Sequence, residues 1–158
     1  MQKIIAPEMG AFYALLFLPH GVRVLTFYFF GWMGYVYLLP ASLLMWAISN
    51  YSGQNALLFM SFLTAMVSCH IGVILVKYLF EADDRLGAFT YSWRNVLIAG
   101  IVGSLLNSVS QTWLYESDLE MQSLLGYFIG DVTGQFALML IILSFVRIAR
   151  MIADLPDK

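Results

Sequence analysis

Two charged side chains of opposite sign, Arg23 and Asp131, interrupt long apolar runs of the sequence, and His20 lies almost one helical turn before Arg23. If these runs cross a membrane, each ionised side chain costs at least about 2.5 kcal/mol unless it is compensated. We therefore expect Asp131 to pair with Arg23, with His20 or with both. The trio is either an intramembrane site for an anionic or polar ligand, or an ion pair that fixes helix packing.

Amide side chains accompany these charges. Gln135 lies one turn after Asp131, and Asn107 and Gln111 lie one turn apart in another apolar run. Two amides on one stripe present several hydrogen-bond donors and acceptors to a common space. Ligand contact and hydrogen bonding between helices both remain open for these residues.

Small residues recur at helical spacing and predict close helix packing. Small residues let helix backbones approach, and hydroxyl groups can bond across helices, where lipid leaves little hydrophobic force between them. The residues that we expect to serve packing are Gly126, Gly130, Gly134, Ser104 and Ser108.

Composition indicates that the solvent of this chain is lipid. Of 158 residues, 61% are hydrophobic and only 11% are charged, and the mean hydropathy is +0.79. Soluble domains carry roughly 25% charged residues. The net charge of −2 and the absence of a long basic block argue against nucleic acid as a partner.

Charged residues fall in clusters, and the apolar runs between the clusters predict an all-α, polytopic bundle that forms one integral membrane domain over residues 1–158. The five expected spans are 9–31, 34–49, 55–77, 95–114 and 122–146. We expect Pro19-His20-Gly21 to break the first span, because proline removes a helix hydrogen bond. Whether residues 9–31 cross once or fold back stays open.

The basic residues set the expected orientation. Six of the eight Lys and Arg residues lie between spans three and four or at the C-terminus, and the loop at 116–120 is acidic. The positive-inside rule then predicts a cytoplasmic C-terminus and an N-terminus on the outer side.

Catalytic and metal-binding patterns are missing from the sequence. It has no Gly-x-Ser-x-Gly elbow, no phosphate-binding glycine loop and no His-Glu-x-x-His, so we expect no enzymatic activity. Cys69 and His70 have no further ligand at suitable spacing, so no metal is expected. His20 and His70 are weak candidates for axial haem ligands because their expected depths differ, and we expect no cofactor.

Several blocks resemble the first class of bacterial membrane-associated sensor domains. Residues 18–23 (Leu-Pro-His-Gly-Val-Arg), with 30–32 and 39–40, resemble its Pro-x-Gly helix and the turn that follows. Residues 130–134 (Gly-Asp-Val-Thr-Gly) resemble its Gly-Asp-x-x-Gly element, and 92–97 resemble the start of an intermediate helix. The resemblance implies an input module of the bacterial inner membrane, with a periplasmic N-terminus. This chain has fewer expected spans and no output domain, so we expect its signal to leave through a partner protein.

Three functions fit the sequence. The first is a non-catalytic sensory input bundle that signals through a partner. The second is a small accessory or scaffold subunit of a larger membrane complex, docked through its glycine and serine faces. The third, weaker interpretation is the substrate-binding subunit of a transporter. In each case the expected partners are the lipid bilayer and other membrane proteins.

Overall fold

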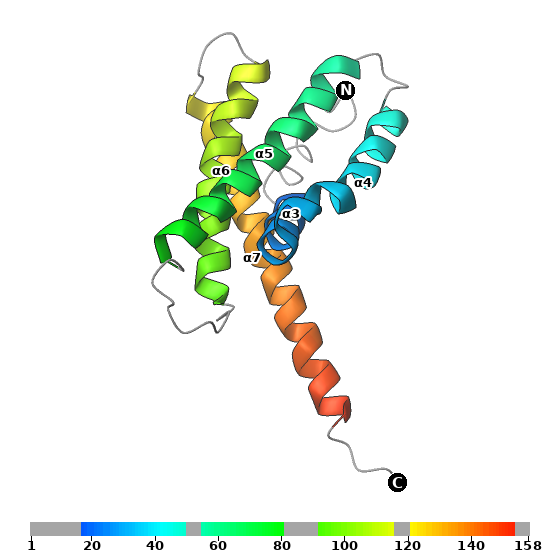
Figure 1. The fold of residues 1–158 in the computed structure, drawn as a ribbon, viewed down its shortest axis with the longest axis vertical. Helices are drawn as coiled ribbons and strands as arrows, with labels where there is room; N and C mark the ends of the chain where they lie inside the picture. The colour runs from blue at the N-terminus through cyan, green and yellow to red at the C-terminus, as the bar shows by residue number, and fades with distance from the viewer. Residues whose placement is uncertain (1–16, 50–54, 81–91, 116–120, 154–158) are drawn as a thin grey trace.

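The computed structural model describes residues 17–49, 55–80, 92–115 and 121–153, which form helices with no strand among them. This part of the chain therefore confirms the all-α prediction. The elements are α3 (Leu18–Phe30), the short 3-10 helix η1 (Gly31–Met33), α4 (Gly34–Ser49), α5 (Asn55–Phe80), α6 (Trp93–Tyr115) and α7 (Met121–Ala153). In Figure 1, α3 is seen nearly end-on against α5, α6 and α7, so it crosses these helices rather than running beside them.

Among the described residues, four segments, not the expected five, are long and apolar enough to cross a membrane. They are Leu18–Leu44, Phe59–Phe80, Trp93–Leu114 and Met121–Ala153. The first joins α3, η1 and α4, because the 13 residues of α3 reach only about 20 Å and cannot alone cross a hydrocarbon core of about 30 Å. Five spans are therefore not confirmed, and residues 9–16 of the expected first span lie outside the described residues.

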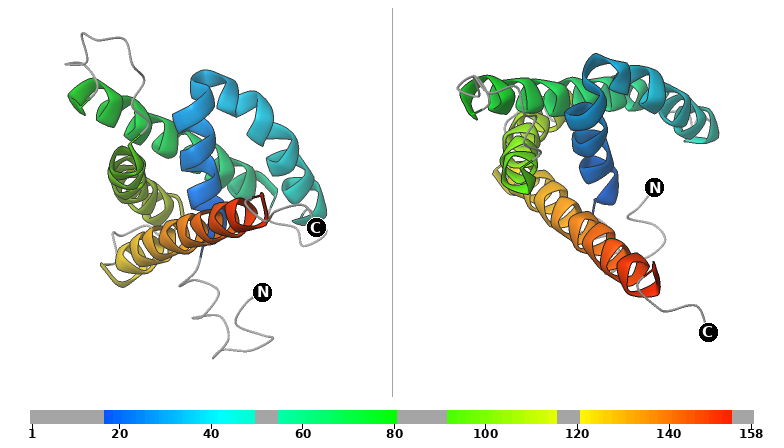
Figure 2. Two further views of the ribbon diagram at one scale, coloured as in Figure 1. Left: turned by 90° about the horizontal axis from the view of Figure 1, so that it is seen from below. Right: turned by 60° about the horizontal axis from the view of Figure 1, so that its bottom comes forward.

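The expected break at Pro19-His20-Gly21 is likewise not confirmed. These residues form the first turn of α3, where proline is tolerated because the N–H that it lacks would have no partner within the helix. The chain instead changes direction after Phe30, at Gly31, whose φ of 54° is a left-handed conformation that glycine adopts without strain. Figure 2 shows α4 turning back from α3 at this point.

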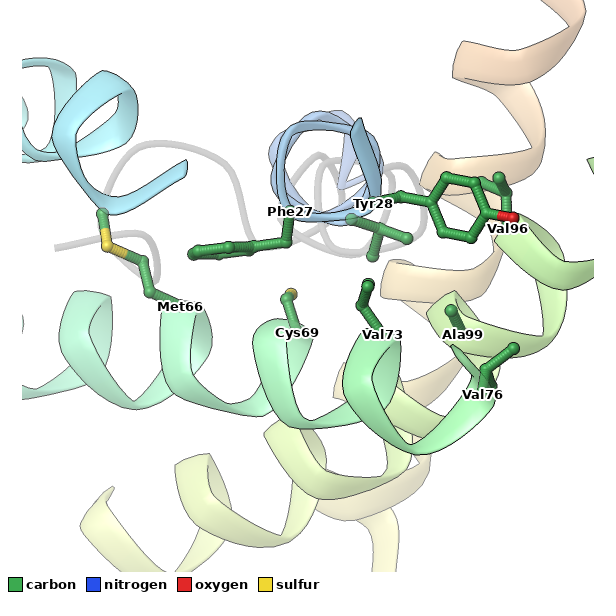
Figure 3. Close-up of a cluster of buried hydrophobic side chains, with 9 residues drawn as sticks. Phe27, Tyr28, Met66, Cys69, Val73, Val76, Val96 and Ala99 are labelled. Carbon is green, nitrogen blue, oxygen red and sulfur yellow. The ribbon is translucent and has the colours of Figure 1, made fainter. Parts of the chain in front are cut away.

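The apolar core lies where α3 packs against α5 and α6. Phe27 and Tyr28 of α3 are buried; Phe27 extends toward Met66 of α5, whereas Tyr28 extends toward Val96 of α6 (Figure 3). The remaining members of the cluster are Val24, Cys69, Val73, Val76 and Ala99. The core therefore holds the part of α3 that follows its buried polar residues, His20 and Arg23.

Close backbone contacts support this packing at particular glycines. A Cβ on Gly72 of α5 would lie 2.7 Å from the Ala99 carbonyl oxygen of α6. On α7, a Cβ on Gly134 would overlap the backbone of Phe17, and the Gly130 carbonyl accepts a hydrogen bond from the Phe17 N–H at 3.0 Å. Gly130 and Gly134 thus seat the start of α3 on α7.

The other residues expected to serve packing behave differently from one another. Ser104 donates across to the Phe128 carbonyl of α7 at 3.2 Å, whereas Ser108 is buried but donates to Leu105 of its own helix. Gly126 is exposed and has open space where a Cβ would stand. Gly126 therefore takes no part in the crossing of α3 and α7, which begins at Gly130.

Gly134 and Gly126 form a matched pair for testing this crossing. We expect Gly134→Ala to lower the free energy of unfolding by about 1–3 kcal/mol, because the new methyl group must displace the Phe17 backbone. Gly126→Ala should leave it unchanged or raise it by up to about 1 kcal/mol, since alanine favours helix. Unfolding in mixed micelles titrated with sodium dodecyl sulfate measures both, and equal effects would contradict the crossing.

Candidate functional site: a buried polar chain at the start of α3

His20 projects from the first turn of α3 into the space between three other helices, and its side chain is fully buried. Its Nε2 atom lies 3.2 Å from the Gly100 carbonyl oxygen of α6. Its Nδ1 atom lies 3.2 Å from Asp131 Oδ2 of α7 and 3.6 Å from Cys69 Sγ of α5. One imidazole ring therefore contacts α5, α6 and α7 together.

The partners of His20 determine where its protons lie. A carbonyl oxygen only accepts, so Nε2 carries a hydrogen that it donates to Gly100. Nδ1 and Asp131 Oδ2 would repel each other if both presented lone pairs at 3.2 Å, so a proton lies between them. This proton joins the two side chains in one hydrogen bond.

Asp131 also joins the pair to a run of amides. Its Oδ2 atom accepts a hydrogen bond of 2.6 Å from Asn107 Nδ2, and Asn107 Oδ1 accepts one of 3.2 Å from Gln111 Nε2. Gln111 Oε1 in turn accepts a bond of 2.7 Å from the Ser61 hydroxyl of α5. We call Ser61, Gln111, Asn107, Asp131 and His20 the polar chain, and it connects α3, α5, α6 and α7.

Arg23 does not belong to the polar chain, although the sequence analysis named it as a possible partner of Asp131. Its side chain is buried, with 7% of the residue exposed, yet among the described residues it forms no ion pair and no hydrogen bond. Its guanidinium carbon lies 5.6 Å from the centre of the Phe17 ring, back toward the N-terminal end of α3. Asp131 is paired with His20 instead.

Gln135 is also separate from the polar chain. It is buried and donates to the Val96 carbonyl of α6 at 2.9 Å. A Cβ on Gly100 would overlap its amide group, so glycine at position 100 leaves room for Gln135. Gln135 thus ties α7 to α6.

Two members of the site were missed by sequence reasoning. Cys69 was considered only as a metal ligand, and Gly100 was not proposed for the site, although both contact His20. Cys69 follows the small residue Ala65 by one turn of α5, and this spacing was the available signal. His70 points elsewhere, with its Nδ1 atom 3.1 Å from the Tyr35 hydroxyl and its ring stacked on Phe27.

Comparisons with known proteins identify no family and no function for this chain. The chain matches no family model, no curated protein and no solved structure. In the described part of the chain, no three His, Cys, Asp or Glu side chains are grouped as they would be around a metal ion. The site must therefore be interpreted from its own geometry.

Asn107 allows a direct test of the polar chain. Asn107→Ala removes a donor to the buried carboxyl group of Asp131, and we expect the free energy of unfolding to fall by about 1–3 kcal/mol. Ser110→Ala on the same helix removes only a bond to the Leu106 carbonyl and should change it by less than about 0.5 kcal/mol. The same mixed-micelle titration measures the free energy of unfolding of both variants. An Asn107→Ala variant as stable as the wild type would show that the polar chain does not stabilise the bundle.

Proposed function

We propose that the protein is a non-catalytic helical bundle of the bacterial inner membrane that senses a ligand at its polar chain and signals through a partner protein. The observation that supports this proposal most directly is the position of His20, which touches α5, α6 and α7 from the first turn of α3. A change at this one side chain alters the contacts of four helices at once.

The energies involved are suitable for a switch. Breaking a buried ion pair by removing one partner costs about 3–5 kcal/mol. Coupling between a ligand site and a distant site typically needs about 1–3 kcal/mol. A ligand that competes for the bond between His20 and Asp131 must supply this free energy through its own contacts, and it would displace the start of α3 when it does so.

The positions of the basic residues support the proposed orientation. Lys77 near the end of α5, Arg94 at the start of α6, and Arg147 and Arg150 near the end of α7 lie toward the same side of the bundle, as the course of the helices in Figure 1 shows. We place this side in the cytoplasm by the positive-inside rule. A partner that receives the signal would then meet the end of α7.

Cys69 provides a test of the switch, because it is the sole cysteine and is fully buried against His20. Asp131→Asn keeps the shape of the side chain but removes the acid that shares a proton with His20. We expect alkylation of Cys69 by N-ethylmaleimide in membranes to become at least about tenfold faster. This rate corresponds to a free energy of local opening that is lower by roughly 1.4 kcal/mol. Ser110→Ala is the control, and equal rates in all three proteins would argue against a switch at this pair.

The partner is sought by purification in mild detergent and mass spectrometry of the proteins that accompany the chain. We expect a signalling protein that is recovered with the wild type and whose recovery or activity changes with Asp131→Asn. Recovery of the same proteins in the same amounts and activities with both would oppose the sensing function.

A second candidate, an accessory subunit of a larger complex, is favoured by the far end of α7. Residues 140–153 are exposed on every side, and Figure 1 shows this segment extending past the other helices. With 33 residues α7 is about 50 Å long, about 20 Å more than a hydrocarbon core. Apolar side chains near its end, such as Ile148 and Ile152, would then pack against a helix of another subunit.

The two candidates respond to different substitutions. If the protein is an accessory subunit, Ile148→Glu should abolish recovery of stoichiometric membrane subunits, whereas Asp131→Asn should leave that recovery intact. If it is a sensor, Asp131→Asn should alter the state of its partner. The same purification compares both variants with the wild type.

A further inference from the structure

Arg23 is the buried charge at the start of α3 that the polar chain does not bond. The carboxyl group of Asp131 bonds His20 and Asn107 instead. Arg23, one turn further along α3, keeps its positive charge in proteins and carries five N–H donors. Within the described residues none of these donors has an acceptor, although only 7% of the residue is exposed. Burying a guanidinium without a hydrogen-bond acceptor is costly, and a bound anion would lower this cost.

The helix itself adds to the positive potential at this place. Side chains of a helix lean toward its N-terminus, and the Arg23 guanidinium does so, since it lies over Phe17 at the residue before α3. Phe17 has no side-chain oxygen to cap the first turn, Pro19 has no N–H, and the His20 N–H donates to the Phe17 carbonyl at 3.2 Å, so this turn contributes its dipole rather than a full set of donors. The positive end of the helix dipole and the unpaired guanidinium therefore lie at the same end of α3.

We infer that Arg23 and the N-terminus of α3 bind an oxyanion, namely the carboxylate or phosphate group of a small molecule or of a lipid. The planar guanidinium fork matches both groups through two parallel hydrogen bonds. A bound oxyanion would neutralise Arg23 beside His20, one turn away on the same helix. This inference rests on the proposed sensing function and names the chemical class of its ligand.

The test uses the full chain, purified in dodecyl maltoside and freed of phosphate. Sodium phosphate or sodium acetate replaces sodium chloride at constant ionic strength, and tryptophan fluorescence follows the midpoint of thermal unfolding. We expect a saturable rise of the midpoint with at least one probe. Native mass spectrometry of protein taken directly from membranes forms the second arm, and one retained acidic phospholipid per chain would identify a lipid as the source.

Arg23→Gln should weaken oxyanion binding at least tenfold or remove the retained lipid. Arg94→Gln removes the same charge from an exposed position and should bind as the wild type does. Arg23→Lys keeps the charge but not the fork, and should bind with an affinity between those of the wild type and Arg23→Gln. The inference is overturned if the wild type responds to neither probe and retains no lipid, or if Arg23→Gln binds like Arg94→Gln.

Failure of this inference can be told apart from failure of the sensing function. If no oxyanion binds but Asp131→Asn still exposes Cys69 and alters the partner, the inference is wrong and the sensing function stands with another ligand. If an oxyanion binds at Arg23 but neither it nor Asp131→Asn changes Cys69 alkylation or the partner, the anion site is real and the sensing function is wrong.

Discussion

A polar group that is buried in an apolar medium must find its partner within the protein, and this constraint organises the centre of the bundle. Asp131 satisfies it by drawing together one side chain from α3 and one from α6. Each of these partners is in turn bonded to a further group, at Gly100 for His20 and at Gln111 for Asn107. The position of α3 among the other helices therefore follows from how one carboxyl group is satisfied.

Glycines make this arrangement sterically possible. The polar chain requires the start of α3 to approach α7 closely, and Gly134 supplies the space that the Phe17 backbone occupies. Gly72 does the same between α5 and α6, so that Cys69 on α5 and Gly100 on α6 both reach His20. Small residues and polar residues thus act together. The small residues set the distance between the helices, and the polar residues form hydrogen bonds across that distance.

Sequence patterns predicted the participants of the site better than their pairing. Charge and amide types in apolar runs were sufficient to select His20, Asp131, Asn107 and Gln111, because each is costly to bury alone. Spacing along a helix gives the face of a residue but not the level at which another helix crosses it. For this reason the pattern could not separate Gly126 from Gly134, and it could not decide between Arg23 and His20 as the partner of Asp131.

Packing explains most of the polar chain but does not explain Arg23. Hydrogen bonds between helices can account for the amides and for the His20–Asp131 pair, since all of these side chains have partners on other helices. A purely structural role for Arg23 would be filled at lower cost by an apolar side chain of similar volume, because such replacements of buried charges are often neutral or stabilising. The unpaired guanidinium is thus the feature of the site that packing does not explain, and the proposed oxyanion site rests on it.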